Sequence, residues 1–337
     1  MKKKVNIPIF IPHVGCPNAC VFCNQRKISG RTGFDFASVR KELDKAFSTV
    51  PEDVSAQIAY FGGSFTGIDR DDMIALLALA GEYMDAGKCE SIRISTRPDY
   101  IDEEILKILQ EYRVRTVELG IQSTDDAVLR ASGRGHTAED SRRAAALLKQ
   151  YGFEWIGQMM AGLPLGTAEN ERQTALDIVH MGADGARIYP TVVFDDTELA
   201  RMMEKGLYEP LSTQESSERA ANILGVFIEN QVPVIRIGLQ ASETLISGRG
   251  VLAGGYHPAV GEMAYALCFR DMVERTLQKA DAQGKSVTVY VHPYDISKMI
   301  GQRGANREYL MKTYGLSGFR VKPDENTNKN QPRTEIQ

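Results

Sequence analysis

The stretch AQIAYFGGSFTGIDRDDMIALLALAGEYMDAG, residues 56–87, decides the fold class of this chain. It opens with a short apolar run that is typical of a buried strand. A glycine-rich turn follows, and from residue 72 the apolar residues recur at the spacing of an amphipathic helix. The stretch is therefore one strand–loop–helix unit.

The same order recurs along the first 230 residues. Strand-like runs lie at residues 5–11, 56–62, 91–96, 115–122, 154–162 and 186–193, with helical patterns between them, as at 102–112 and 141–152. Six such units predict parallel strands joined by right-handed crossovers. We expect an α/β fold, either a partial (β/α)6 TIM-like barrel or an open wound sheet. In both folds the polar loops that follow the strands meet at one rim.

Composition limits the function classes. Lys and Arg number 40 and Asp and Glu 44, a net charge of −4, so a nucleic-acid surface must be local. Five unevenly spaced cysteines do not make a disulfide framework. The apolar run near the N-terminus is too short for a signal peptide, and no window has the length of a membrane span. We expect a cytoplasmic protein.

Three of the cysteines, Cys16, Cys20 and Cys23, lie in a polar loop after the first predicted strand. Buried free thiols are one interpretation, which the polar neighbours disfavour. A structural zinc ion is a second, with His13 as a fourth ligand. The third is a four-iron cluster held by three thiolates, which leaves one iron open to a ligand from outside the protein.

The spacing CxxxCxxC, with the aromatic Phe22 before its last cysteine, resembles the signature of the radical S-adenosylmethionine (SAM) superfamily. The resemblance implies that the three cysteines bind a [4Fe–4S] cluster and that SAM occupies the open iron. It further implies reductive cleavage of SAM to a 5′-deoxyadenosyl radical that abstracts hydrogen from a substrate. A low-potential electron donor is then a required partner.

Later motifs agree with the superfamily in order. GGSFTG (62–67) resembles its glycine-glycine motif, and GLP (162–164) resembles the segment that lines the adenine of SAM. Ser95 stands where relatives often have a glutamate that contacts the ribose of SAM. Ser95, Thr96 and Gln122 are therefore all candidates for the ribose contact. The SAM contacts that the resemblance implies are therefore Phe22, Gly62, Gly63, Ser64, Ser95, Thr96, Arg97, Gln122, Gly162 and Leu163.

Several of these rim residues have a structural alternative. Arg97 is equally suited to the SAM carboxylate and to a salt bridge at the rim. Arg134 and His136 lie just before Thr137 and Asp140, where local helix capping is the simpler role.

Within the superfamily, ISTRPDYI (94–101), VELGIQSTDDAVLRASGRGHT (117–137) and ARIYPTVVFDDTELARMMEKGLYEPLS (186–212) resemble the radical domain of the Elongator catalytic subunit and its bacterial relatives. The resemblance spans about residues 5–240 and lacks the acetyltransferase domain of that subunit, so carboxymethylation from acetyl-CoA is not implied. Part of it, GIQS…GRGHT, is shared with oxygen-independent coproporphyrinogen oxidases.

Composition changes near residue 231, and we divide the chain into the barrel (1–231), a C-terminal module (232–323) and a polar, disordered tail (324–337). In the module, a GXXG loop between two helical patterns looks like the core of a KH domain, whose loop clamps single-stranded nucleic acid. An ordinary helix–turn–helix connection is the alternative. The candidate RNA contacts are Lys298, Gly301, Gln302, Arg303, Gly304 and Arg307.

These observations predict a radical SAM enzyme that modifies RNA, with tRNA favoured by the Elongator resemblance. The local charge supports an RNA partner, because residues 287–322 hold six Lys and Arg against two Asp and Glu. One alternative is a radical SAM enzyme acting on a small metabolite such as a porphyrinogen. Another is a non-catalytic RNA-binding protein with a structural metal.

Overall fold

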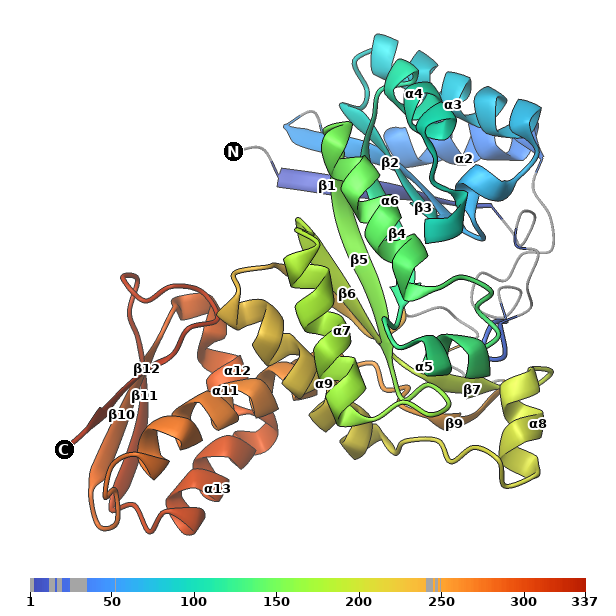
Figure 1. The fold of residues 1–337 in the computed structure, drawn as a ribbon. Helices are drawn as coiled ribbons and strands as arrows, with labels where there is room; N and C mark the ends of the chain where they lie inside the picture. The colour runs from blue at the N-terminus through green and yellow to red at the C-terminus, as the bar shows by residue number, and fades with distance from the viewer. Residues whose placement is uncertain are drawn as a thin grey trace.

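The computed structural model describes residues 3–11, 16, 20–24, 35–51, 53–240, 245, 248 and 250–337 (Figure 1). Its largest element is a curled parallel sheet whose strand order is β1-β2-β3-β4-β5-β6-β8. The outer strands β1 and β8 do not pair with each other, so the sheet is an open partial barrel, which confirms the predicted fold class. The strands are β1 (Lys3–Ile11), β2 (Val54–Gly62), β3 (Ser91–Thr96), β4 (Val114–Gln122), β5 (Glu154–Ala161), β6 (Gly185–Pro190) and β8 (Val234–Ile237).

Helices connect successive strands and pack their apolar faces on the sheet in one large core. Each connecting helix begins after an Asp, Ser or Thr whose side chain accepts a hydrogen bond from an amide of the first turn. They are α2 (Phe36–Phe47), α3 (Arg70–Asp85), α4 (Glu103–Glu111), α6 (Ala138–Gln150), α7 (Ala168–His180) and α9 (Thr213–Glu229), with the short α5 (Asp126–Ala131) and α8 (Glu198–Glu204) at the rim.

The seventh strand corrects the predicted domain boundary. β8 lies in the segment that the sequence assigned to the C-terminal module, yet it pairs in parallel with β6 and completes the barrel sheet. It follows α9 as one more strand–helix–strand crossover, which a change in composition does not reveal. A small antiparallel pair, β7 (Val192–Phe194) with β9 (Val251–Gly254), lies at the rim.

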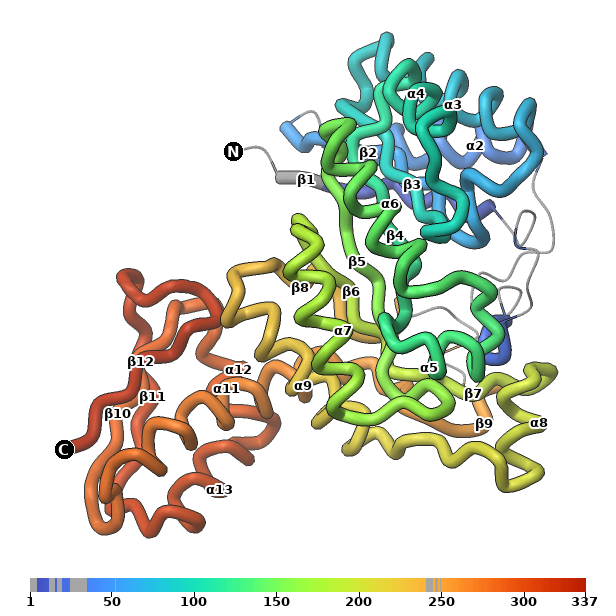
Figure 2. Tube along the Cα trace, viewed as in Figure 1, coloured from blue at the N-terminus to red at the C-terminus, as the bar shows by residue number. Residues whose placement is uncertain are grey.

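The C-terminal module has its own three-stranded sheet in the order β11-β10-β12 and its own apolar core (Figure 2). β10 pairs in parallel with β11 and antiparallel with β12. The elements are α11 (Val260–Gln278), β10 (Ser286–Val291), α12 (Ile296–Ile300), α13 (Ala305–Thr313), β11 (Gly318–Pro323) and β12 (Arg333–Ile336).

The C-terminal residues 324–337 are ordered, which corrects the prediction of a disordered tail. Residues 333–336 form β12 and pair with β10, and Ile336 packs against the module core. The segment between β11 and β12 is also held in place, because the backbone amide of Asn330 donates to the Asp295 carboxylate at 2.6 Å. The polar composition suggested disorder, but backbone hydrogen bonds to an available sheet edge order the segment.

α11 joins the two parts. Ala264 and Cys268 lie in the barrel core, whereas Phe269, Val273 and Leu277 lie in the module core. With 19 residues α11 is the longest helix described. In the part of the chain that the structure describes, no helix is both long enough and apolar enough to cross a membrane.

Candidate active site

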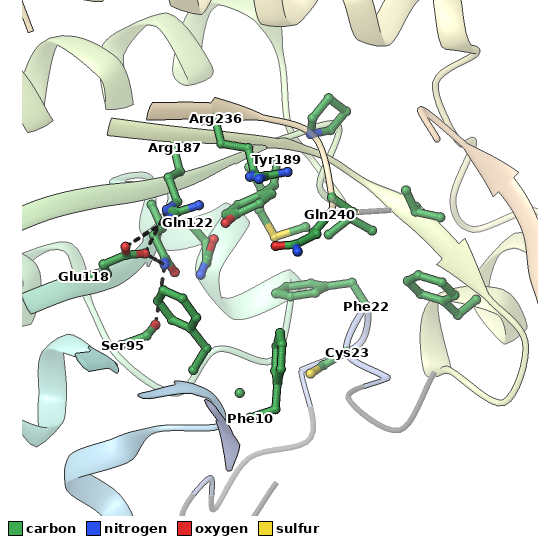
Figure 3. Close-up of a pocket in the computed structure, with 18 residues that line it drawn as sticks. Phe10, Phe22, Cys23, Ser95, Glu118, Gln122, Arg187, Tyr189, Arg236 and Gln240 are labelled. Atoms are coloured by element: carbon green, nitrogen blue, oxygen red, sulfur yellow. Dashed lines mark hydrogen bonds and ion pairs between the residues drawn. The ribbon is translucent and has the colours of Figure 1, made fainter. Parts of the chain in front are cut away.

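The carboxyl ends of the barrel strands surround a cavity of about 220 Å³ (Figure 3). Five of the residues predicted from the sequence line it: Phe22, Cys23, Gly62, Ser95 and Gln122. Phe10, Phe22 and Phe61 line the cavity, and the ring centroids of Phe10 and Phe61 lie 6.4 Å apart. We call these three residues the phenylalanine wall. The topology thus brings the segment after β1 and the carboxyl ends of β2, β3 and β4 to one place, as expected at the carboxyl edge of a parallel sheet.

The cysteine segment is anchored at this rim. The Cys23 amide donates to the Cys20 carbonyl at 3.0 Å. The Val21 amide donates to the Ser132 carbonyl, and the Val21 carbonyl accepts from the Leu199 amide. Burial raises the pKa of the Cys16 thiol, while the Ser64 backbone and the charges of Arg97 and Arg134 lower it.

No set of three or more His, Cys, Asp or Glu side chains in the described ranges is already arranged around a metal position. The assignment of the three cysteines as ligands therefore stays a prediction. All three thiols are free of disulfides. His13, the fourth ligand of the zinc alternative, lies outside the described residues.

The glycine-glycine turn has no room for a larger residue at its first position. Gly62 has a φ of +123°, and a Cβ there would lie 2.1 Å from the Ile11 carbonyl oxygen. The Gly63 amide donates to the same oxygen at 3.2 Å. This turn holds the backbone of β2 close to the end of β1, where the cysteine segment starts.

Two hydroxyls predicted as SAM contacts are used inside the protein. Ser64 and Thr96 are hydrogen-bonded through their hydroxyls at 2.7 Å, and Thr66 contacts Thr96 at 2.6 Å. Both predicted residues are buried. Of the ribose candidates, only Ser95 and Gln122 face the cavity.

Gln122 is placed by an irregularity at the end of β4. The register with β5 shifts between Gly120 and Gln122, and Gln122 adopts a φ of +65°. Its Oε1 is buried and has no hydrogen-bond partner among the described residues. A strained, buried acceptor beside a cavity is suited to a ligand hydroxyl.

Arg97 makes the salt bridge considered for it, and its contact with SAM stays a prediction. Its Nε and Nη2 donate to the Asp99 carboxylate, each at 2.9 Å, so the rim salt bridge exists. Its Nη1 is buried and has no acceptor within the described part of the chain. A guanidinium held by one carboxylate and left with one directed donor fits the carboxylate of SAM.

Arg134 belongs to the site, although the sequence suggested a capping role. The capping box is real, but it is made by Thr137 and Asp140. Arg134 instead donates to the Gly120 carbonyl at 2.5 Å and to the Cys20 sulfur at 3.5 Å. In the sequence, the only indication of a special role for Arg134 is its position between two glycines, GRG at 133–135.

His136, beside Arg134, should make stability depend on pH. Burial and the Arg134 charge lower its pKa to about 4, whereas an unfolded histidine titrates near 6.5. The stability from the neutral ring is present above pH 6.5 and is lost as pH falls through about 4. His136→Gln should remove about 2 kcal/mol of the loss between pH 7 and pH 5 in urea unfolding. The exposed-site variant His180→Gln is the control, and equal pH slopes for both variants would contradict the prediction.

A buried charge network that the sequence did not predict forms part of the cavity wall. Glu118 accepts from Arg93 Nη1 at 2.8 Å, from Arg187 Nη2 at 2.9 Å and from Gln158 Nε2 at 2.7 Å. The Glu118 side chain is 1% exposed. In the sequence, the strand runs at 91–96, 115–122 and 186–193 each contain one of these charged residues. Charged residues are rarely buried in strands unless they are paired.

The GLP turn lies elsewhere. Gly162 and Leu163 line a separate hollow next to Tyr208 rather than the cavity at the strand ends. The amide of Gly162 donates to Glu171 at 2.7 Å, and its carbonyl accepts from Tyr208 at 2.6 Å. These backbone groups are therefore already hydrogen-bonded within the protein.

The GXXG loop is an exposed turn of the C-terminal module. Gly301, Arg303 and Gly304 all have positive φ, and the side chains of Gln302 and Arg303 are exposed. Asn306 supports the loop from below through hydrogen bonds to the carbonyls of Ala266 and Met299. The loop backbone is exposed, and its contact with nucleic acid stays a prediction.

The other two candidate RNA contacts differ. Arg307 is exposed on α13. Lys298 donates to Asp295 and to Asn330, each at 2.7 Å, and lies over the Tyr265 ring. It stabilises the module and is less available to a ligand.

Two family models match the chain. The model of the Radical SAM superfamily matches residues 10–177, and that of the Radical_SAM C-terminal domain matches residues 183–267. The second match runs through β8 and into α11, in agreement with the observed extent of the barrel.

Known proteins are similar over the same region. The tRNA uridine(34) acetyltransferase of Methanocaldococcus jannaschii is 33% identical over 134 residues, 39% of this chain and 25% of the relative. Elongator complex protein 3 of Mus musculus is 29% identical over 217 residues, 62% of this chain and 38% of the relative. The chain thus spans well under half the length of these relatives.

One solved structure supports the fold. The archaeal Methanocaldococcus infernus Elp3 with an N-terminal deletion has a TM-score of 0.64 at 21% identity, covering 82% of this chain and 64% of that chain. At this identity the similarity is one of fold.

Proposed function

The chain belongs to the radical SAM superfamily, and we propose that it is an enzyme that uses a [4Fe–4S] cluster and SAM to modify RNA, with tRNA favoured. The observation that carries this is the position of the family motif: the three cysteines lie beside the glycine-glycine turn, Arg97 and Arg134, next to a cavity of the barrel. When bound, the cluster and SAM supply one-electron chemistry that begins with hydrogen abstraction from the substrate.

The residues present fit these groups. The thiolates of Cys16, Cys20 and Cys23 are the ligand type that iron–sulfur clusters require. The Nη1 of Arg97 and the guanidinium of Arg134 would hold the carboxylate of SAM, since both lie by the cysteine segment. The unpaired acceptor of Gln122 would take a ribose hydroxyl. These protein groups bind and orient; they do not react.

The phenylalanine wall and Met160 give the cavity an apolar lining beside Cys23. Such a lining excludes water from the place where a reactive species forms and so limits side reactions.

Two observations favour RNA as the substrate. Relatives named for tRNA uridine(34) and for the Elongator complex match the barrel region. The C-terminal module presents an exposed GXXG loop with Arg303, and Arg307 follows on the next helix. We propose that the module is KH-like and grips the RNA backbone while the cavity receives the target nucleotide.

The function is tested by anaerobic reconstitution with iron, sulfide, SAM and dithionite. 5′-Deoxyadenosine is measured with and without tRNA and with other RNA. We expect faster formation with tRNA, and nucleoside mass spectrometry of RNA from cells lacking the gene should show a missing modification. Formation that no RNA accelerates would contradict the RNA substrate, and no SAM cleavage at all would contradict the reaction class.

Arg303→Glu should weaken RNA binding by about tenfold, because a phosphate contact becomes a repulsion. The slope of log K against log salt should also fall by about one. Filter binding at several salt concentrations measures both. Arg142→Glu, at an exposed site on α6, is the matched control. A loss of RNA-independent SAM cleavage equal to the loss of RNA binding would contradict the division of roles between barrel and module.

A further inference from the structure

β8 places a second arginine in the wall of the cavity. In the parallel register Arg236 of β8 stands directly opposite Arg187 of β6, and both line the cavity (Figure 3). Like charges directly opposite on neighbouring strands repel each other and destabilise a sheet. The pair therefore needs a compensating negative charge.

The protein supplies only part of that charge. Glu118 is the one acidic side chain among the described residues that line the cavity. It is shared by two guanidinium groups, those of Arg93 and Arg187. Arg236 makes no ion pair with any described carboxylate. One carboxylate thus faces three guanidinium groups, and the excess positive charge lies at the Arg236 end.

That end of the cavity is rich in hydrogen-bond donors. Figure 3 shows Arg236 beside the ring of Tyr189, with Gln240 near by. Arg236 is half-buried, so water screens its charge only in part. The Phe61 ring of the phenylalanine wall has the Arg187 guanidinium 5.7 Å from its centroid. Phe10 and Phe22 line the same cavity, and their rings are of the kind on which nucleobases stack.

The carboxylate of SAM does not account for this charge. Its proposed partners, Arg97 and Arg134, lie by Cys16 and Cys20, and neither lines the cavity. The Arg236 end is formed by different strands, β6 and β8.

We propose that Arg236 and Tyr189 form an anion-binding subsite that holds a phosphate of the substrate nucleotide, with its base against the phenylalanine wall. The proposal rests on the proposed RNA substrate. A phosphate would supply the missing negative charge and can accept two parallel hydrogen bonds from the guanidinium.

Two measurements on the reconstituted protein with SAM bound test the subsite. Uridine 5′-monophosphate and uridine are the probes, because pyrimidines avoid competition with adenine. Wild type should bind the monophosphate about tenfold more tightly than the nucleoside. Arg236→Gln should lose that preference, and Arg115→Gln, an exposed arginine on β4, should keep it. In the absence of nucleotide, Arg236→Gln should unfold at a higher urea concentration than wild type, because the repulsion is removed.

Equal binding of uridine and its monophosphate by wild type would overturn the proposal, as would a preference that persists in Arg236→Gln. Succinate is the carboxylate probe: binding of succinate without binding of the monophosphate overturns the phosphate assignment in favour of a small acidic metabolite. RNA-dependent formation of 5′-deoxyadenosine separates the two proposals. RNA stimulation without the phosphate preference rejects only the subsite, and the preference without RNA stimulation rejects only the RNA substrate.

Discussion

Replacement of Cys16, Cys20 or Cys23 by serine should reduce the proposed reductive cleavage of SAM to background. A neutral hydroxyl does not replace a thiolate as an iron ligand, so each variant should lose the cluster. The brown colour, the iron and sulfide content and the yield of 5′-deoxyadenosine should fall together. No other single change in the chain should have so large an effect on activity.

Cys89→Ala and Cys268→Ala are the matched controls, because both thiols are buried away from the cavity. They should retain the cluster, with only a modest loss of stability. A cluster that survives Cys20→Ser but not Cys89→Ala would refute the ligand assignment. One equivalent of zinc without iron would support a structural metal instead.

Glu118→Gln should lower the free energy of unfolding by about 3–5 kcal/mol, the largest effect on stability that we expect. The Arg93 and Arg187 side chains are each 10% exposed and share this one carboxylate. Removing its charge leaves two nearly buried guanidinium groups without a counter-charge. Urea unfolding of the variant and wild type measures the difference.

Two further variants test the cause of that loss. Glu139→Gln removes the carboxylate of an exposed pair on α6 and should cost less than about 1 kcal/mol. Arg187→Met combined with Glu118→Gln should recover part of the lost stability, because it removes one uncompensated charge. If Glu118→Gln costs no more than Glu139→Gln, the network contributes little to folding.

The barrel could be predicted from the sequence because its first six strands are local apolar runs. Each is followed by a glycine-rich or polar turn and a capped helix, so adjacent residues carry the information. β8 is four residues long and follows a proline. Its place in the sheet depends on pairing with β6, a contact between distant segments that no local pattern records.

The site residues show the same difference between local motifs and contacts of distant segments. Cys16, Cys20, Cys23 and the glycine-glycine turn were predicted because a short motif identifies them. Arg134, Glu118 and Arg236 were not, because their roles depend on strand register and on which side chains meet across the barrel. β12 was missed for a related reason: its polar residues form a strand only because the edge of β10 is available.

α11 spans the barrel and the C-terminal module. The helix is about 28 Å long, with one half packed in the barrel core and the other in the module core. Asn306 ties the GXXG loop to the carbonyl of Ala266 in the middle of this helix. The helix and Asn306 thus set the distance between the loop and the cavity. In the proposed function, an RNA bound at the loop would present to the cavity only a nucleotide at the matching distance along its fold.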